Sequence, residues 1–279
     1  MSKDSLGDRM KENYENRYCF SLTRRTPVII RIDGKAFHTL TKHMVRPFDS
    51  IITYSMWETA KALCEEIMGC RIAYTQSDEI SLLLTDYEKL ESQAWFDYNV
   101  QKCASVSASL ATKAFNTAFS EACMHFTLTD VPNMLEKYSL PKKNVRNTTP
   151  EVFELCYSGA VWNALFDARV FNIPESEVCN YFIWRQQDAT RNSIEMLGRC
   201  YFSSKELHKV NCSQIQEKLA KEKNVNWNSF PDFFKRGVCV VKSLEENEKR
   251  AKWHVDKNIP VFTQDRNYIE QHLPVDDTK

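Results

Sequence analysis

Apolar and polar residues alternate in blocks along the first half of the chain, and the first blocks predict a strand followed by a helix. The β-branched run at 28–32 predicts a buried strand. Apolar residues then recur at helical spacing over 52–67. Asp49 and Ser50 are candidate caps at the start of this helix, and Gly69 stands where its C-terminal cap is expected.

Two further strands and a second helix follow. Residues 71–75 and 80–84 predict a strand pair joined by a turn at 76–79. Few helix breakers and many Ala, Ser and aromatic residues predict a long helix over 92–122. The order strand, helix, strand, strand, helix is most of a β-α-β-β-α-β ferredoxin-like unit. We therefore expect an α+β fold in which helices pack on an antiparallel sheet.

The pattern is weaker elsewhere in the chain. We predict a helix at 9–18, a strand pair or one bent strand at 161–173, a helix from Pro174 through 184, a helix at 203–222, a strand at 238–241 and a charged tail after Leu244. The best candidate boundary is a basic loop bracketed by Pro132, Pro141 and Pro150. It divides the chain into a half at 1–140 and a half at 141–279 with a smaller helical part, and the two halves could form one compact domain.

Acidic residues stand where two of the predicted strands meet. In the ferredoxin-like topology the first and third strands are antiparallel neighbours, so Asp33 at the end of the first lies near Asp78 and Glu79 before the third. Paired carboxylates bind the divalent ions that phosphoryl chemistry needs. This geometry is that of a polymerase-palm metal site. Taken alone, however, each of these acidic segments is also typical of a solvated turn.

Composition bears on the class of protein and on its compartment. Lys plus Arg and Asp plus Glu both number 37, so the net charge is zero. The overall charge therefore gives no evidence for a nucleic-acid partner. The 10 Cys form no C-x-x-C pair and no apolar leader precedes them, so we expect reduced, mostly buried thiols such as Cys64, Cys103 and Cys179. This favours the cytoplasm, with mitochondria as the alternative. No apolar run reaches transmembrane length, so we expect a soluble protein without a membrane partner.

Other catalytic or binding patterns are weak. His38, His43 and His208 lack the spacing of zinc ligands, and there is no G-x-S-x-G nucleophile elbow. Candidate phosphate-binding side chains are Arg46, Arg169, Lys235 and Arg236, although a basic residue is more often solvated surface. The residues alone therefore favour nucleotide-phosphate chemistry at the paired carboxylates over hydrolysis by a triad or a zinc site.

Several motifs in fixed order resemble the tRNA-His guanylyltransferase family, and most closely its guanylyltransferase-like branch of 3′-to-5′ RNA polymerases. They are Leu6-Gly7-Asp8-Arg9-Met10-Lys11, Arg31-Ile32-Asp33-Gly34-Lys35-Ala36-Phe37-His38, Tyr74-Thr75-Gln76-Ser77-Asp78-Glu79, Phe166-Asp167-Ala168-Arg169-Val170, Trp184-Arg185-Gln186-Gln187-Asp188-Ala189-Thr190-Arg191-Asn192-Ser193 and Phe234-Lys235-Arg236-Gly237. Any one of them is unremarkable, but their joint order is highly specific.

The resemblance implies a palm-like nucleotidyltransferase that binds two Mg²⁺ ions and uses ATP and GTP or another nucleoside triphosphate. The half at 1–140 would be the catalytic palm, and the half at 141–279 would complete the catalytic and tRNA-binding surface. The implied metal ligands are Asp33, the Gly34 carbonyl and Asp78, with Glu79 beside them as a catalytic or orienting group. The implied nucleotide-binding residues are Asp33, Gly34, Lys35, Ala36, Phe37, His38, Arg46, Ser77 and Asp78.

The resemblance also bears on the RNA substrate. Arg169, Asn192, Lys235 and Arg236 would bind tRNA or phosphate, and the family suggests a homotetramer. Strict tRNA-His enzymes carry a His-Ile-Asn-Asn motif where this chain has 190–193 with the sequence Thr-Arg-Asn-Ser. This difference favours template-dependent repair of 5′-truncated tRNA over addition of a single G to tRNA-His. The remaining alternatives are a nucleotide cyclase and, in another class, a non-catalytic tRNA-binding module.

Overall fold

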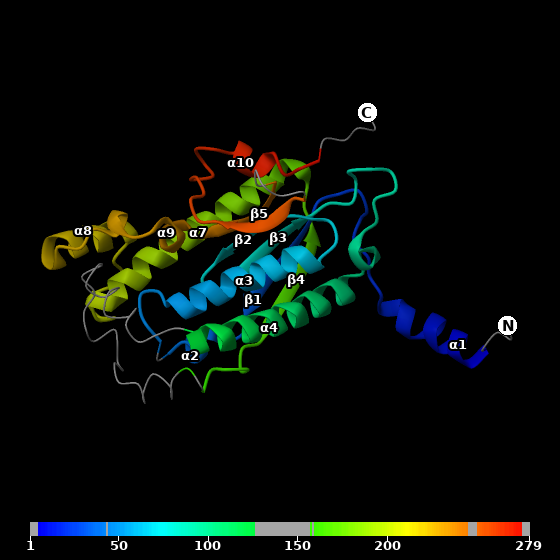
Figure 1. Ribbon diagram of the computed structural model, residues 1–279, viewed down its shortest axis with the longest axis horizontal. Coiled ribbons are helices and arrows are strands. Elements are labelled where there is room, and N and C mark those ends of the chain that lie inside the picture. The colour runs from blue at the N-terminus through cyan, green and yellow to red at the C-terminus, as the bar shows by residue number, and fades with distance from the viewer. Residues whose placement is uncertain (1–4, 43, 126–156, 158, 245–249, 275–279) are drawn as a thin grey trace.

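A six-stranded antiparallel sheet forms the centre of the molecule (Figure 1). The computed structural model describes residues 5–42, 44–125, 157, 159–244 and 250–274. The strands are β1 (Val28–Gly34), β2 (Cys70–Gln76), β3 (Glu79–Leu84), β4 (Phe166–Asn172), β5 (Val238–Ser243) and β6 (Lys252–Asp256). They lie in the order β4-β1-β3-β2-β5-β6, and every pair is antiparallel. The predicted α+β class and the neighbouring positions of the first and third strands are confirmed.

The alternation of side chains along β1 explains why its apolar run is continuous. Ile30 and Ile32 point into one core, whereas Ile29 points into another on the opposite face of the sheet. Successive strand side chains point to opposite faces, so a strand with two covered faces needs apolar residues at successive positions. Beyond Ile32 the strand reaches the end of the sheet, where Asp33 can reach water.

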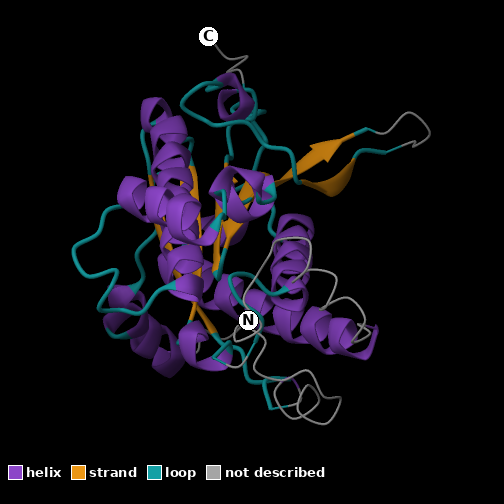
Figure 2. Cartoon of the chain, turned by 90° about the vertical axis from the view of Figure 1, so that its left-hand side faces the viewer, coloured by secondary structure: helices purple, strands orange, loops and turns teal. Residues whose placement is uncertain are grey.

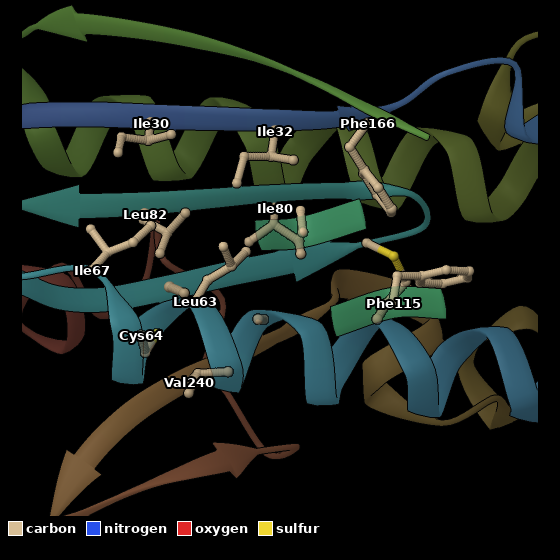
Figure 3. Close-up of a cluster of buried hydrophobic side chains, with 14 of the residues drawn as sticks. Ile30, Ile32, Leu63, Cys64, Ile67, Ile80, Leu82, Phe115, Phe166 and Val240 are labelled. Carbon is tan, nitrogen blue, oxygen red and sulfur yellow. The ribbon is translucent and has the colours of Figure 1, made fainter. Parts of the chain in front are cut away.

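Two helices cover the first face. They are α3 (Ser50–Glu66) and α4 (Val100–His125), and they pack on each other and on the sheet. Figure 3 shows Leu63 of α3 facing Ile80 of β3, with Cys64 of the same helix near Val240 of β5. The Asp49 side chain accepts hydrogen bonds from the first backbone N–H groups of α3, which confirms it as the cap.

The opposite face is crossed by α7 (Glu175–Tyr201), so that the sheet lies between two layers of helices (Figure 2). Val178 and Phe182 of this helix pack on Ile72 and Tyr74 of β2. The short α10 (Asn267–Glu270) adds Ile269 to the same core. The far half of α7 carries a smaller helical part, formed by α8 (Cys212–Lys223) and α9 (Asp232–Arg236).

The second long helix begins later than the predicted residue 92. Before it lies the 3₁₀ turn η2 (Trp95–Tyr98), in which Phe96 and Asp97 have positive φ values of 49° and 53°. The helix starts at Val100, after the Asn99 side chain accepts a hydrogen bond from the Lys102 backbone N–H. The predicted helix over 92–122 was therefore wrong in its first turns, because the left-handed residues there are not glycines and give no breaker signal.

The second half differs from its predicted elements at several points. The segment at 161–173 holds one strand, β4, and the helix that starts after Pro174 runs on to Tyr201. The helix predicted at 203–222 begins only at Cys212, where Asn211 and Gln214 form a capping box. The charged segment after 244 is more than a tail, since it contains β6 and α10, with Phe262 and Ile269 buried between α7 and the sheet.

The remaining elements of the described residues are short. They are α1 (Ser5–Asn13), η1 (Glu15–Tyr18), α2 (Phe37–Leu40) and η4 (Trp227–Ser229). The predicted helix at 9–18 is therefore two pieces that meet near Tyr14, and α2 was not predicted. All nine cysteines in the described part are free thiols, five of them buried, as expected for reduced cysteine.

The predicted domain boundary cannot be placed, whereas the described helices can be compared with the length of a membrane span. The basic loop with its three prolines, and with it the boundary near residue 140, lies outside the described residues. Among the helices of the described ranges, none has the length and apolar character needed to cross a membrane.

Candidate active site

Two carboxylates from distant parts of the chain meet at one end of the sheet. Antiparallel pairing of β1 with β3 sets Asp33 opposite Glu79, and Asp78 immediately precedes Glu79 in the β2–β3 turn. The Gly34 backbone N–H donates a hydrogen bond of 3.0 Å to the Asp78 carbonyl oxygen, which ties the two segments together. The predicted convergence is thus present.

The β2–β3 turn holds Asp78 in a partly buried position. Ser77 takes the left-handed conformation, with φ of 51°, and its hydroxyl donates a 3.0 Å hydrogen bond to the Asp78 carboxylate. Burial raises the pKa of Asp78; the Ser77 hydrogen bond opposes this rise and the charge of Asp33 adds to it. A positive ion bound beside these two carboxylates would relieve their mutual repulsion.

The loop after Asp33 owes its shape to a buried aromatic ring. Phe37 packs against Phe115 and Phe166, with ring centroids 5.3 Å and 5.1 Å away. Its ring lies so close under the backbone that a Cβ on Gly34 would come within 2.3 Å of it, so only glycine fits there. Ala36 takes a left-handed φ of 55°, and α2 follows.

The remaining predicted nucleotide-binding residues are distributed around this loop. Lys35, Ala36 and His38 are exposed, and the Lys35 backbone N–H donates a 2.8 Å hydrogen bond to the Leu165 carbonyl oxygen. Arg46 is exposed farther along, before a cis proline. The loop therefore offers one charged side chain beside the carboxylates, while the ring of Phe37 is structural in this arrangement.

Glu79 is held by a buried arginine. Arg185 of α7 donates a 2.6 Å hydrogen bond from Nε to the Glu79 carboxylate, and a second of 2.9 Å from Nη2 to Asp188. The Glu79 and Arg185 side chains are only 10% and 7% exposed. Burial raises the pKa of Glu79, whereas the charges of Arg185 and Arg31 oppose this rise. The bond from Glu79 to Arg185 thus ties the β2–β3 turn to α7. One Glu79 carboxylate oxygen already accepts the Arg185 hydrogen bond.

The sheet face beside α7 carries an acidic row followed by a basic row. Asp33 is flanked across the strands by Asp167 on β4 and Glu79 on β3. One step back on the same face, Arg31 lies opposite Arg169 on β4. Both β4 side chains are about half exposed, and they form a 3.6 Å ion pair with each other. This edge of the face is consequently open to a large, charged ligand.

The residues predicted to bind tRNA or phosphate lie in different environments. Arg169 is exposed on this open edge. Asn192, on α7, donates a 3.3 Å hydrogen bond to Asp188. Lys235 and Arg236, on α9, both form ion pairs with Asp232, at 3.0 Å and 2.6 Å. All four side chains therefore have a partner on the protein, and Arg169, which is 52% exposed, is the most accessible of them.

The donor set fits magnesium. No group of three or more His, Cys, Asp or Glu side chains is arranged to hold a metal in the part of the chain that the structure describes. Mg²⁺ commonly uses only one or two carboxylates and fills its other positions with water and substrate phosphates. Asp33 and Asp78, whose charges repel each other, together with the Gly34 carbonyl, supply such a partial set.

Sequence reasoning gave no role to Arg185, Trp184 or Arg31, although all three belong to the motifs. The Trp184 ring lies beneath the guanidinium of Arg185, 4.4 Å from its central carbon, and 5.9 Å from that of Arg31. A charged residue three positions before Asp188 on a helix was a signal for an i,i+3 ion pair. Nothing in the sequence showed that the same arginine reaches back to Glu79.

An antiparallel palm-like sheet with paired carboxylates at its end is the arrangement expected of a nucleotidyltransferase. The sequence profile of the family described as "tRNAHis guanylyltransferase" matches residues 7–174, more than half of the chain. The chain belongs to this family, whose members are nucleotidyltransferases that act on tRNA.

Solved structures and curated relatives agree with this assignment. A bacterial tRNA(His) guanylyltransferase (Thg1)-like protein in complex with ATP is 42% identical, with a TM-score of 0.78, and the match covers 98% of this chain and 100% of that one. The structure of such a protein in complex with GTP is 41% identical over 96% and 99% of the two chains, with a TM-score of 0.74. The tRNA(His) guanylyltransferase of Debaryomyces hansenii is 26% identical over 83% of this chain and 82% of its own.

Proposed function

We propose that this enzyme adds nucleotides to tRNA 5′ ends in the 3′-to-5′ direction and chooses each nucleotide by pairing with the opposite RNA strand. The observation that carries the transfer chemistry is the meeting of Asp33 and Asp78 at the open end of the sheet. The bound ATP and GTP of the similar bacterial structures support nucleoside triphosphates as substrates here. tRNA as the acceptor follows from the family.

The reaction has two steps. An oxygen of the RNA 5′-monophosphate first attacks the α-phosphorus of ATP or GTP, and pyrophosphate leaves. The 3′-hydroxyl of the incoming nucleotide then attacks the activated 5′-phosphorus, and the nucleoside monophosphate leaves as a new phosphodiester forms. Phosphoryl transfer of this kind depends chiefly on positioning and on charge stabilisation.

The residues present divide this work. Asp33, Asp78 and the Gly34 carbonyl would hold Mg²⁺, which when bound neutralises phosphate charge and acidifies the attacking hydroxyl. The exposed Lys35 side chain would supply a cation to the triphosphate, and backbone of the same loop would bind its oxygens. Glu79 keeps the turn that carries Asp78 in place through its bond to Arg185.

The segment at 190–193 supports templated choice of the base. It lies within α7, and its polar groups are engaged with the helix and its neighbours. Arg191 pairs with Asp188, and Asn192 donates to the same carboxylate. Ser193 donates to the Thr190 carbonyl oxygen and accepts a hydrogen bond from an indole N–H. A base pair rejects a wrong base by leaving polar groups unpaired, so such a segment need not read guanine itself.

The test supplies each nucleotide singly with 5′-monophosphorylated tRNAs that lack their first nucleotide and differ only in the opposing base. Full-length tRNA-His serves as the comparison substrate. We expect G to be added opposite C, and the other bases opposite their own partners, with tRNA-His the poorer acceptor. Addition of G alone, whatever base stands opposite, would show a dedicated G-adding enzyme. No magnesium-dependent addition to any RNA would favour the non-catalytic tRNA-binding module.

A further inference from the structure

A half-exposed tryptophan stands beside the paired carboxylates. Trp184 of α7 is 51% exposed, although indole is among the side chains that bury most apolar area. Its neighbours Tyr181, Phe182 and Arg185 are all buried. Trp184 is thus the one exposed large aromatic side chain in this otherwise buried part of α7, and it lies toward the open edge of the sheet.

This ring is held in a fixed orientation. The Arg185 guanidinium lies 4.4 Å from the ring centroid and is itself anchored by Glu79 and Asp188. The Tyr181 ring meets the indole edge to face, with centroids 5.8 Å apart. A cation over an aromatic ring and an edge-on neighbour both restrict the indole. An exposed ring that does not need to be ordered on binding is suited to stack a flat ligand.

The ring is also close to the reacting end of the sheet. The Arg31 guanidinium lies 5.9 Å from the indole centroid. Arg31 and Asp33 are two residues apart on the same face of β1, a separation of about 7 Å along a strand. Arg169 lies directly across from Arg31 on the edge strand β4. The indole and two cations therefore border the carboxylates on one side.

One nitrogen of the Arg31 guanidinium lacks a hydrogen-bond partner. Its Nε is buried and unpaired among the described residues, although the Arg31 charge acts on nearby Glu79. Leaving such a donor unsatisfied is unfavourable, and a bound anion would satisfy it. Phosphate oxygens next to a stacked base supply that anion, and the combination of aromatic ring and arginine is the usual chemistry of single-stranded RNA recognition.

We propose that Trp184 is a stacking site for the base at the RNA 5′ end, with Arg31 and Arg169 facing the adjoining phosphates. This site rests on the proposed function, because that function brings an RNA 5′ end to Asp33 and Asp78. The indole covers the outer face of the terminal base while the 5′-phosphate reaches the carboxylates. The same stacking chemistry would suit the base of a free nucleoside triphosphate, so the test must separate the two sources.

The experiment measures binding of a 5′-monophosphorylated acceptor-stem RNA without nucleotide, and of ATP and GTP without RNA. The variants are Trp184→Ala and Trp184→Phe. The matched control is Trp253→Ala, which removes a part-buried indole with its own lysine contact of 5.7 Å on β6, at the opposite edge of the sheet. Thermal unfolding of each variant checks that it is folded.

We expect Trp184→Ala to weaken RNA binding about 5- to 150-fold, the range for loss of one stacked base. Trp184→Phe should keep most of the affinity, and Trp253→Ala should match the wild type. ATP and GTP should bind unchanged. An RNA whose first nucleotide is abasic should bind the wild type and Trp184→Ala equally. The salt dependence should be unaltered by Trp184→Ala but reduced by Arg169→Ala, because stacking releases no counterions.

Two results would overturn the assignment. Equal RNA affinity of the wild type and Trp184→Ala shows that the ring does not stack the RNA end. If Trp184→Ala weakens ATP or GTP binding and leaves RNA binding unchanged, the indole stacks on the base of the nucleoside triphosphate instead. Failure of the wild type itself to bind or extend the RNA would count against the proposed function, and is thus distinct from failure of this site.

Discussion

Arg185→Met should destabilise the fold far more than loss of an ordinary surface charge. Arg185 donates to Glu79 at 2.6 Å and to Asp188 at 2.9 Å. Asp188 keeps Arg191 and Asn192 as partners in the variant, but Glu79, whose side chain is only 10% exposed, loses its ion pair with Arg185. Removing one partner of a buried pair costs about 3–5 kcal/mol, because it leaves an uncompensated charge in a poorly solvated place.

The assay is urea unfolding at neutral pH, followed by circular dichroism. The matched control is Arg191→Met, which removes an ion pair to the same Asp188, but with a cation that is 54% exposed. A solvated pair of this kind contributes about 0–1 kcal/mol. The double variant Arg185→Met with Glu79→Gln should recover part of the lost free energy of unfolding, since it removes the stranded charge. A cost for Arg185→Met no greater than that for Arg191→Met would refute the reasoning.

Three other outcomes follow from single contacts. Gly34→Ala should lower the free energy of unfolding by about 1–3 kcal/mol, because its methyl group would lie 2.3 Å from the Phe37 ring; an unchanged urea midpoint would contradict this. Arg169→Ala should weaken tRNA binding and reduce the slope of log affinity against log salt by about one, and an unaltered slope would rule out a phosphate contact. Burial alone would raise the pKa of Asp188, but Arg191 and Arg185 lower it below its usual value. Folded Asp188 therefore binds a proton less readily than unfolded Asp188, and its contribution to stability is lost as pH falls below about 4. Asp188→Asn should flatten the acid side of the stability–pH curve; a curve parallel to wild type would contradict it.

The part of the site formed by strand pairing could be predicted from sequence. Asp33 follows the continuous apolar run of β1 and Asp78 precedes that of β3, and topology alone brings those strand ends together. The Glu79–Arg185 pair could not be predicted, because the two residues are 106 positions apart and only the crossing of α7 over the sheet joins them. The role of Trp184 was hidden for the same reason.

The elements with a strong local pattern were predicted from the sequence, and those held only by tertiary packing were not. Buried strands such as β1 have strong apolar patterns, and Asp49 gave a clear helix start. The edge strand β6, by contrast, carries Lys252 and Asp256 and has no buried residue, so its composition matches a solvated tail. Tertiary packing places it against β5, and no local pattern in the sequence reports that contact.

The most direct test of the central claim is single-turnover nucleotide addition to a 5′-monophosphorylated, truncated tRNA by Asp33→Asn, Asp78→Asn and the double variant. Each protein is first shown by thermal unfolding to be folded. If the two carboxylates act as one metal-binding unit, each single change should abolish addition, and the double variant should lose no more than either single one. Near-wild-type addition by either single variant, or losses that simply multiply in the double variant, would contradict a shared site at the end of β1 and β3.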